Sequence, residues 1–208
     1  MKKEKTVSRL IKEYGIIIAL ILLSAFFGVM KPKFLTASNF LTILKQTSVV
    51  AICSVGMLFV LITAGINLSV GYMMVATGMT AAIFMVWYGM HPALAIILVF
   101  IIMMLVGVVI GWIVAYTNVV SFIVTLAFMN VLKGFSFLVT GGRNVADLPD
   151  SFCWLGTGSI AMIPVPVILM AVALLMGWII LKKMYVGRYF YAIGSNEEAA
   201  RLSGINVK

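Results

Sequence analysis

The side chains with the most chemical character lie in the closing stretch of the chain, YAIGSNEEAARLSGINVK. Ser195 stands three positions before Glu198, which is the spacing of a capping box at the start of a helix. Glu197 precedes Arg201 by four residues, the favourable order for an ion pair on a helix surface. Gly204 follows as a residue suited to end a helix in the left-handed conformation. This pattern predicts a short, well-capped helix rather than a catalytic arrangement.

The predicted helix, at 196–203, needs something to hold it. It is about 12 Å long, too short to be stable by itself in water. Ala199 and Leu202 share one face, which is small for firm binding to a membrane surface. A groove on a partner protein would cover that face better. A generic amphipathic connector without a partner is the alternative.

Other reactive side chains are few and scattered. Cys53 and Cys153 are isolated, His91 stands beside Pro92 in an expected turn, and none has metal-ligand spacing. No G-x-x-x-x-G-K-[ST] phosphate-binding loop occurs. We therefore expect no catalytic residue, no metal site and no cofactor in this chain, which disfavours a membrane enzyme.

Polar residues also interrupt an apolar stretch at GINLSVG, where Gly65 and Gly71 flank Asn67 and Ser69. The segment fits a helix interruption, which is stable at membrane depth only when it is buried in protein or lines a wet cavity. Interrupted helices of this kind often form transport sites. An ordinary turn between two membrane helices is the alternative.

The composition indicates whether water or lipid surrounds these elements. The chain is 63% hydrophobic and 10% charged, with a mean hydropathy of +1.18, whereas a soluble domain is about a quarter charged. Residues 46–132 contain no Asp, Glu, Lys or Arg. The sequence therefore predicts an all-α integral membrane protein.

The apolar stretches predict six transmembrane helices, at 14–30, 46–64, 72–87, 93–116, 119–139 and 160–181. A cytoplasmic N-terminal segment at 1–13 is expected before this transmembrane domain, 14–181, and a cytoplasmic loop at 182–208, which includes the short helix at 196–203, is expected after it. Basic residues gather at both ends of the chain, so both termini are expected in the cytoplasm. The net charge of +9 has this explanation and does not indicate nucleic-acid binding, because no basic face is interleaved with aromatic residues. In the fourth predicted helix, Gly107 and Gly111 have the small-xxx-small spacing of close helix packing.

Four sequence blocks resemble the membrane-spanning permease subunit of bacterial ABC sugar importers, in the ribose-type branch that takes ribose, xylose and similar simple sugars. The blocks are NFLTILKQTSVVAICSVGMLFVLITAGINLSVG (39–71), SFIVTLAFMNVLKG (121–134), IPVPVILM (163–170) and GRYFYAIGSNEEAARLSGINV (187–207). Members of that branch have about ten spans, so this chain resembles the first part of such a permease. It looks truncated after the terminal helix, and a fragment, a truncated gene product and a split subunit are all open.

The resemblance implies a function by alternating access in the bacterial plasma membrane, driven by ATP hydrolysis on a separate subunit. Expected partners are a cytoplasmic ABC ATPase, an extracytoplasmic sugar-binding protein, a second permease subunit and membrane lipid. The terminal segment resembles the coupling helix that docks on the ATPase. Its residues are Asn196, Glu197, Glu198, Ala199, Ala200, Arg201, Leu202, Ser203 and Gly204. Candidate residues of the substrate path are Asn67, Ser69, Thr125 and Asn130, each of which could instead make hydrogen bonds between helices.

Two features bear on the alternatives. The family pattern at 65–71 is usually G-I-D-L-S-V-G, so Asn67 keeps the shape of the acid and loses its charge. A secondary transporter or channel would need ionisable groups inside the spans, and Lys133 is the one charged residue inside a predicted span. Neither the particular sugar nor transport by this chain alone follows from the sequence.

Overall fold

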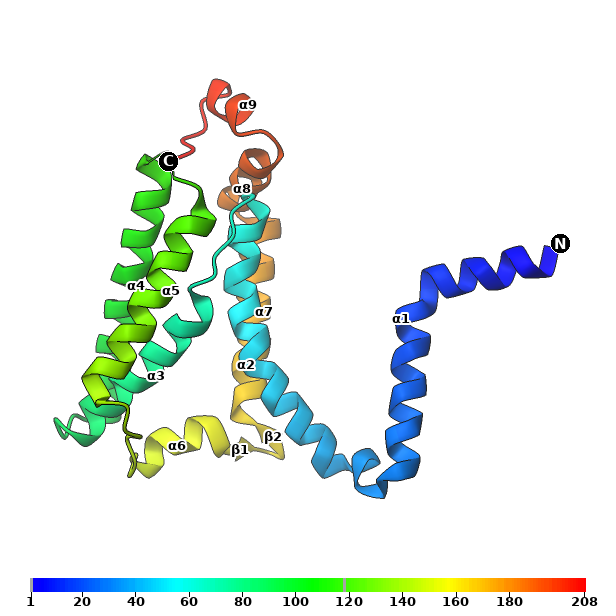
Figure 1. Ribbon diagram of the computed structural model, residues 1–208, viewed down its shortest axis with the longest axis horizontal. Helices are drawn as coiled ribbons and strands as arrows, with labels where there is room; N and C mark the ends of the chain where they lie inside the picture. The colour runs from blue at the N-terminus through cyan, green and yellow to red at the C-terminus, as the bar shows by residue number, and fades with distance from the viewer. Residues whose placement is uncertain (1, 118) are drawn as a thin grey trace. The chain divides into compact units, whose positions relative to one another are not determined.

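The computed structural model describes residues 2–117 and 119–208, with side chains from residue 14 onward. The chain divides into two compact units, one ending at Thr47 and the other running from Ser48 to Lys208. The ribbon in Figure 1 is helical almost throughout. The prediction of an all-α membrane protein is confirmed in this coarse form.

The first unit contains α1 (Lys2–Met30), the 3-10 helix η1 (Pro32–Leu35) and the first residues of α2 (Ala37–Ile62). The Phe27 and Phe34 rings lie 5.8 Å apart, so η1 folds back on the end of α1. Asn39 then ties the start of α2 to η1, because its Nδ2 donates to the carbonyl of Phe34 at 2.8 Å.

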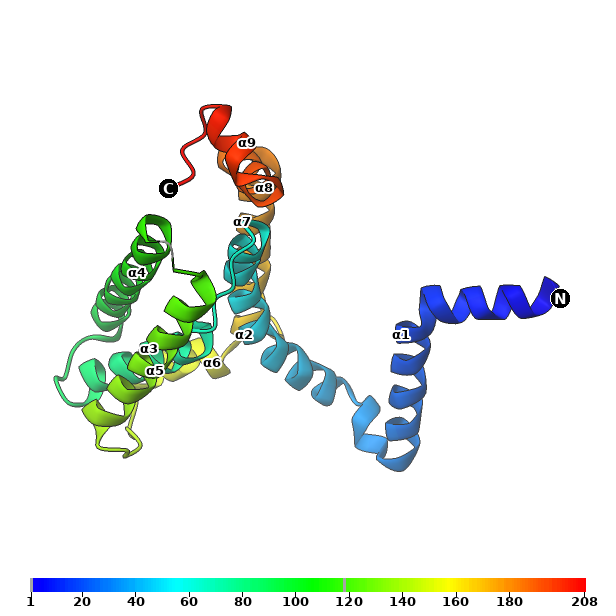
Figure 2. The ribbon, with the colours of Figure 1, turned by 45° about the horizontal axis from the view of Figure 1, so that its top comes forward.

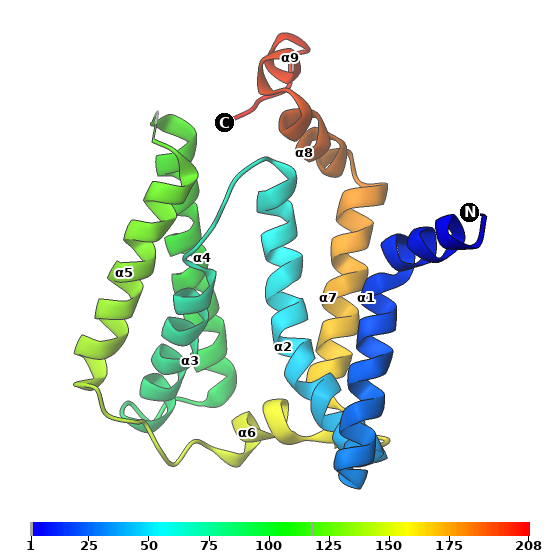
Figure 3. The same ribbon diagram turned by 45° about the vertical axis from the view of Figure 1, so that its right-hand side comes forward.

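The core of the second unit is a bundle of α3 (Val70–Val86), α4 (Pro92–Tyr116) and α5 (Ser121–Thr140), which Figures 1 and 3 show side by side. Helix α3 packs on both of the others. Ala76 and Ala95 are fully buried where α3 meets α4, and such small side chains let membrane helices approach closely. Val99 and Leu132 complete the same cluster from α4 and α5.

The rest of the second unit connects this bundle to the closing helices. It comprises α6 (Asp150–Thr157), the two-stranded hairpin β1 (Ser159–Ile160) and β2 (Ile163–Pro164), α7 (Val165–Lys183), α8 (Tyr185–Ser195) and α9 (Glu197–Leu202). No sequence pattern predicted α6, the hairpin or α8. Helix α7 begins at Val165 rather than at the predicted position 160, because Ile163 precedes Pro164 and lies in the extended strand β2. Figure 2 shows α8 and α9 stacked beyond the end of α7.

Four helices of the described chain are long and apolar enough to cross a membrane: α2, α4, α5 and α7. The apolar part of α1, Tyr14–Met30, and helix α3 are shorter. At most 22% of any of the four apolar windows is buried inside the protein, so most of their apolar surface is left for lipid. Six spans and cytoplasmic termini stay a prediction.

Gly107 and Gly111 make no helix contact with the part of the chain that the structure describes. A Cβ atom built on either glycine meets nothing within 4 Å among the described residues. Their face of α4 is open among the described residues, and close helix packing at these glycines stays a prediction.

Helix α2 ends in a left-handed cap made by an unusual residue. Gly65 N–H donates to the carbonyl of Val60, and Ala64 N–H donates to the carbonyl of Leu61, both at 3.0 Å. This is the Schellman pattern, with Ala64 at φ +59° in the position that glycine normally takes.

Ala64→Gly is expected to stabilise the chain by about 1 kcal/mol, because a side chain in the left-handed region costs about 1–2 kcal/mol. Thermal unfolding of the purified protein in detergent measures the shift. Ala51→Gly, inside the same helix, is the matched control and should destabilise by about 1 kcal/mol. Equal shifts of the same sign in both variants would contradict this assignment of the cap.

Candidate functional site

The closing helix α9 is capped by Asn196 rather than by Ser195. The Asn196 Oδ1 accepts from the backbone N–H of Ala199 at 2.9 Å. Ser195 is still the last residue of α8, and the chain turns at Asn196, where the backbone is extended. The capping box predicted from Ser195 and Glu198 was therefore placed one residue too early, because the preceding helix α8 was not foreseen.

The end of α9 has the geometry that Gly204 suggested. Gly204 has φ +81°, its N–H donates to the carbonyl of Arg201 at 3.0 Å, and Ile205 N–H donates to the carbonyl of Ala200 at 3.1 Å. Arg201 pairs with Glu198 at 3.9 Å rather than with Glu197. Both partners of that pair are exposed, so it contributes little to stability.

The two faces of α9 differ in what they contact. Ala200 is buried against the rest of the chain, with 4% of its surface exposed. Leu202 is 81% exposed. A leucine held this far out on a six-residue helix is available for contact with another molecule.

Helix α8 joins α9 to the end of α2 through very close backbone contacts. A Cβ atom on Gly194 would collide with the carbonyl of Ile62, the last residue of α2. The Phe59 and Phe190 rings meet edge to face at 5.7 Å beside that contact. Gly187 similarly packs against the last carbonyls of α7. The glycines of the block GRYFYAIGS permit these approaches, because a side chain at either position would collide with backbone.

The segment between α2 and α3 is extended, and Figure 3 shows it running lengthwise from the end of α2 to the start of α3. Ile66 N–H donates to the Ser121 hydroxyl at 3.1 Å. Thr125 accepts from Leu68 N–H and lies within hydrogen-bond distance of the Ile66 carbonyl, both at 3.2 Å. Side chains of α5 thus take the place of the missing helical hydrogen bonds, as irregular backbone in a membrane requires.

The two glycines that flank this segment have different roles. Gly65 lies in the cap of α2, where a Cβ atom would crowd Val60. Gly71 lies inside α3, and a Cβ atom there would meet nothing within 4 Å among the described residues. The break therefore spans 63–69, and Gly71 does not take part in it.

Three of the four candidate path residues come together at this break. Asn67 Oδ1 accepts from the backbone N–H of Ser69 at 2.9 Å and from its hydroxyl at 2.6 Å. Ser69 is fully buried and Thr125 is 2% exposed. Their hydrogen bonds hold the extended backbone in place. A role for them in the substrate path stays a prediction.

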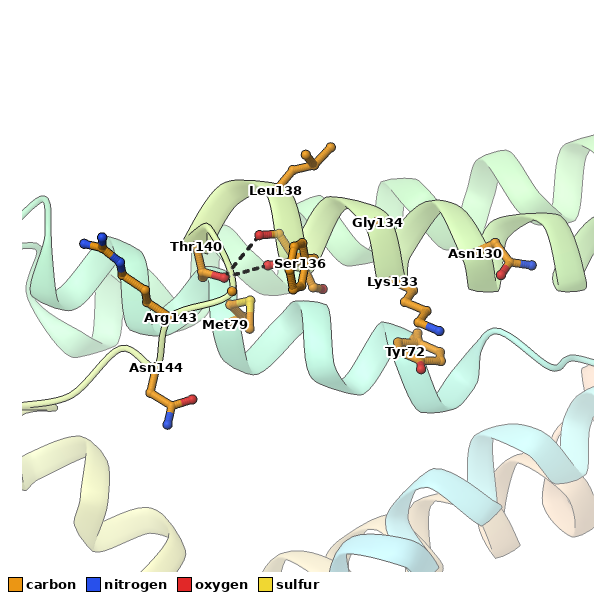
Figure 4. Close-up of a pocket in the computed structure, with 12 residues that line it drawn as sticks. Tyr72, Met79, Asn130, Lys133, Gly134, Ser136, Leu138, Thr140, Arg143 and Asn144 are labelled. Carbon is orange, nitrogen blue, oxygen red and sulfur yellow. Dashed lines mark hydrogen bonds between the residues drawn. The ribbon is translucent and has the colours of Figure 1, made fainter.

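Asn130 lies apart from that cluster, on the exposed surface of α5. Its Nδ2 donates to the carbonyl of Leu126 at 2.9 Å. The residue lines a groove between α3 and α5, shown in Figure 4, together with Tyr72 and Lys133. Among the residues that the structure describes, no group of His, Cys, Asp or Glu side chains could hold a metal ion.

Thr125→Val is expected to lower the free energy of unfolding by about 1–3 kcal/mol, because it leaves the partly buried Leu68 N–H and Ile66 carbonyl of the break without their Thr125 partner. Thermal unfolding in detergent gives the size of the change. Thr77→Val is the matched control, since that hydroxyl donates only to the carbonyl of Met73 within its own helix. Similar losses for both variants would show that Thr125 does not hold the break.

Comparison with known proteins supports the assignment of this chain to a family of transport proteins. Residues 39–208 match the family described as the branched-chain amino acid transport system / permease component. The chain therefore belongs to this family of permease components. No solved structure matches it.

Similar curated proteins indicate which branch of the family this chain resembles. The chain is 43% identical to the ribose import permease protein RbsC of Haemophilus influenzae, across 100% of this chain and 66% of that protein. It is 40% identical to RbsC of Escherichia coli K12, across 92% of this chain and 60% of the relative. The D-allose transport system permease protein AlsC of E. coli is 33% identical, across 94% of this chain and 60% of its own length. The resemblance to ribose-type ABC sugar permeases is confirmed, and the chain spans less than two thirds of the length of these relatives.

Proposed function

We propose that this chain is a membrane-spanning part of an ABC importer for a monosaccharide such as ribose. In this role it helps to move sugar from an extracytoplasmic binding protein into the cytoplasm by alternating access, and a partner ATPase supplies the energy. The observation that carries the proposal is the 43% identity to a ribose import permease over the whole chain. The exposed Leu202 on the capped helix α9 supports it, because an ABC permease needs a cytoplasmic contact for its ATPase.

Helix α9 is suited to be that contact. Its caps at both ends reduce the entropy that binding must overcome, and a short helix that lays an apolar side chain into a groove is a common mode of recognition. Residues 196–204 form the proposed ATPase-coupling surface, with Leu202 as its apolar anchor and Glu197, Glu198 and Arg201 as its charged rim.

The packing of α8 offers a route by which α9 could move the transmembrane helices. A displacement of α9 carries α8 with it, and Gly194 transmits the displacement to the end of α2 through direct backbone contact with Ile62. The extended segment begins at once after α2, and Ser121 and Thr125 tie it to α5. We propose that this series of contacts couples ATPase closure to rearrangement of α2, α3 and α5.

The proposed surroundings follow from this role. The partners are a cytoplasmic ABC ATPase, an extracytoplasmic sugar-binding protein, a second permease subunit and lipid of the bacterial plasma membrane. ATP hydrolysis takes place on the ATPase, and this chain needs no cofactor of its own. The secondary-transporter alternative has no specific observation in its favour.

A sugar-uptake assay in which the energy source is varied tests the proposal. Membrane vesicles containing this chain, a ribose-type ABC ATPase and its sugar-binding protein should accumulate labelled ribose when ATP is supplied on the side of the membrane where the ATPase is bound. Accumulation should stop when the ATPase is replaced by a variant unable to hydrolyse ATP. Uptake that follows an imposed ion gradient and ignores ATP would identify a secondary transporter instead.

A further inference from the structure

The junction of α7 and α8 carries three cationic side chains that the coupling surface does not use. Lys182, Lys183 and Arg188 are the only charged residues between Asp150 and Glu197 in the sequence. All three are exposed, and none of them forms an ion pair with the residues that the structure describes. We call these three residues the basic corner. Cations gathered without a counter-ion attract an anionic partner.

The exposed face of α7 changes in character toward the basic corner. Helix α7 is long and apolar enough to cross a membrane. Leu175, Trp178 and Lys182 follow one another at helical spacing on one exposed face. The order from leucine through tryptophan to lysine is that of a membrane helix leaving the hydrocarbon and entering the headgroups. The last turn of α7 therefore lies at the level of the lipid headgroups.

Helix α8 changes direction at this same level. Met184, between the two helices, has extended backbone, and Figure 3 shows α8 inclined to the axis of α7. Gly187 packs on the last carbonyls of α7, and Gly194 packs on the carbonyl of Ile62. These contacts fix one face of α8 against the ends of the membrane helices and leave the opposite face free.

The free face of α8 is aromatic as well as basic. Tyr185, Tyr189 and Tyr191 are exposed around Arg188, and the rings of Tyr185 and Tyr189 meet edge to face at 5.8 Å. Tyrosine and tryptophan are enriched at membrane surfaces, because the ring contacts acyl chains while its polar end reaches water and headgroups. A helix face of this composition is suited to lie in the headgroup layer.

We propose that the basic corner and the tyrosine face of α8 bind an anionic phospholipid. The lipid phosphate accepts hydrogen bonds from the basic corner, and the exposed rings of Trp178 and Tyr185 contact the glycerol and the first acyl carbons. Lys183 is already beside such a ring, since its Nζ lies 5.8 Å from the centre of Trp178. This site goes beyond the proposed function, because it concerns the lipid and neither the sugar nor the ATPase.

Two observations favour lipid over a protein as the occupant. The basic corner continues the exposed apolar face of α7, which only the bilayer covers along its length. Basic residues at the end of a membrane helix are attracted to anionic headgroups by a factor of about fivefold for each charge. The aromatic face adds contacts that charge alone does not give, so the corner selects a lipid as well as orienting the helix.

Native mass spectrometry tests the site, with the 208-residue chain released from nanodiscs of equal parts phosphatidylglycerol and phosphatidylcholine. The wild-type chain should retain phosphatidylglycerol over phosphatidylcholine by at least about tenfold, since each cation contributes about fivefold. Arg188→Gln should reduce this preference about fivefold, and neutralising all three cations to Gln should abolish it. Both leaflets of a nanodisc have the same composition, so the result does not depend on the orientation of the chain.

Arg201→Gln is the matched control, because Arg201 is also an exposed arginine on a short closing helix but pairs with Glu198 at 3.9 Å. This variant should keep the full preference. Lys182→Arg combined with Lys183→Arg should keep it as well, because a phosphate accepts from either cation. No preference in the wild-type chain, or equal losses with Arg188→Gln and Arg201→Gln, would overturn the site.

Co-purification of the ABC ATPase with the same variants tests the competing occupant. Arg188→Gln should recover as much ATPase as the wild-type chain, because the site binds lipid. Loss of the ATPase with the lipid preference intact would assign this face of α8 to the ATPase and overturn the proposal.

Discussion

Leu202→Asp is expected to reduce the amount of ABC ATPase that co-purifies with the chain at least tenfold, with membrane insertion unchanged. Leu202 is 81% exposed, so the substitution loses almost no packing within the chain, and exposed changes of this kind shift stability by about 0.5 kcal/mol or less. A carboxylate buried in an apolar groove of the partner would be strongly unfavourable. Quantitative pull-down from detergent extracts measures the loss.

Leu155→Asp is the control for this effect. Leu155 is an exposed leucine on the eight-residue helix α6, at the end of the second unit opposite to α9 in Figure 1. This variant should co-purify with the same amount of ABC ATPase as the wild-type chain. Normal recovery of the ATPase with Leu202→Asp would remove α9 from the docking surface.

Gly194→Ala should both destabilise the chain and weaken its association with the ATPase. The added methyl group would collide with the carbonyl of Ile62, a backbone atom that cannot turn away as a side chain can. Overpacking of this kind costs about 1–3 kcal/mol, and relief of the clash moves α8 away from α2. Thermal unfolding and co-purification of the ATPase report the two effects separately.

Gly111→Ala is the matched control, because it adds the same methyl group to a helical glycine with open space around it. This substitution should be neutral or stabilise by up to about 1 kcal/mol. If Gly194→Ala behaved like Gly111→Ala in both measurements, the contact between α8 and α2 would not be the route of coupling.

The elements that the sequence predicted well are those with a strong local signal. Long apolar runs marked α4, α5 and most of α7, because the bilayer imposes both their length and their composition. The acidic first turn and Gly204 marked α9 to within one residue at each end. Such features depend on neighbours in the chain, so one sequence is enough to see them.

The features that escaped prediction depend on residues distant in sequence or on unusual backbone. Helix α8 looked like a loop because its glycines are explained only by contacts with α2 and α7. The hairpin turns through Ala161 and Met162 at positive φ, where Asn and Gly are the usual signals. The groove joins Tyr72 of α3 to Lys133 of α5, and no local pattern predicts that meeting.

Photo-cross-linking from α9 tests the central claim most directly. The chain, with a benzophenone amino acid in place of Leu202, is irradiated in membranes that also contain a ribose-type ABC ATPase. The docking account predicts a cross-link to the ATPase at position 202 and none when the probe replaces Leu155. Cross-links to lipid alone, or equal labelling of the ATPase from both positions, would contradict it.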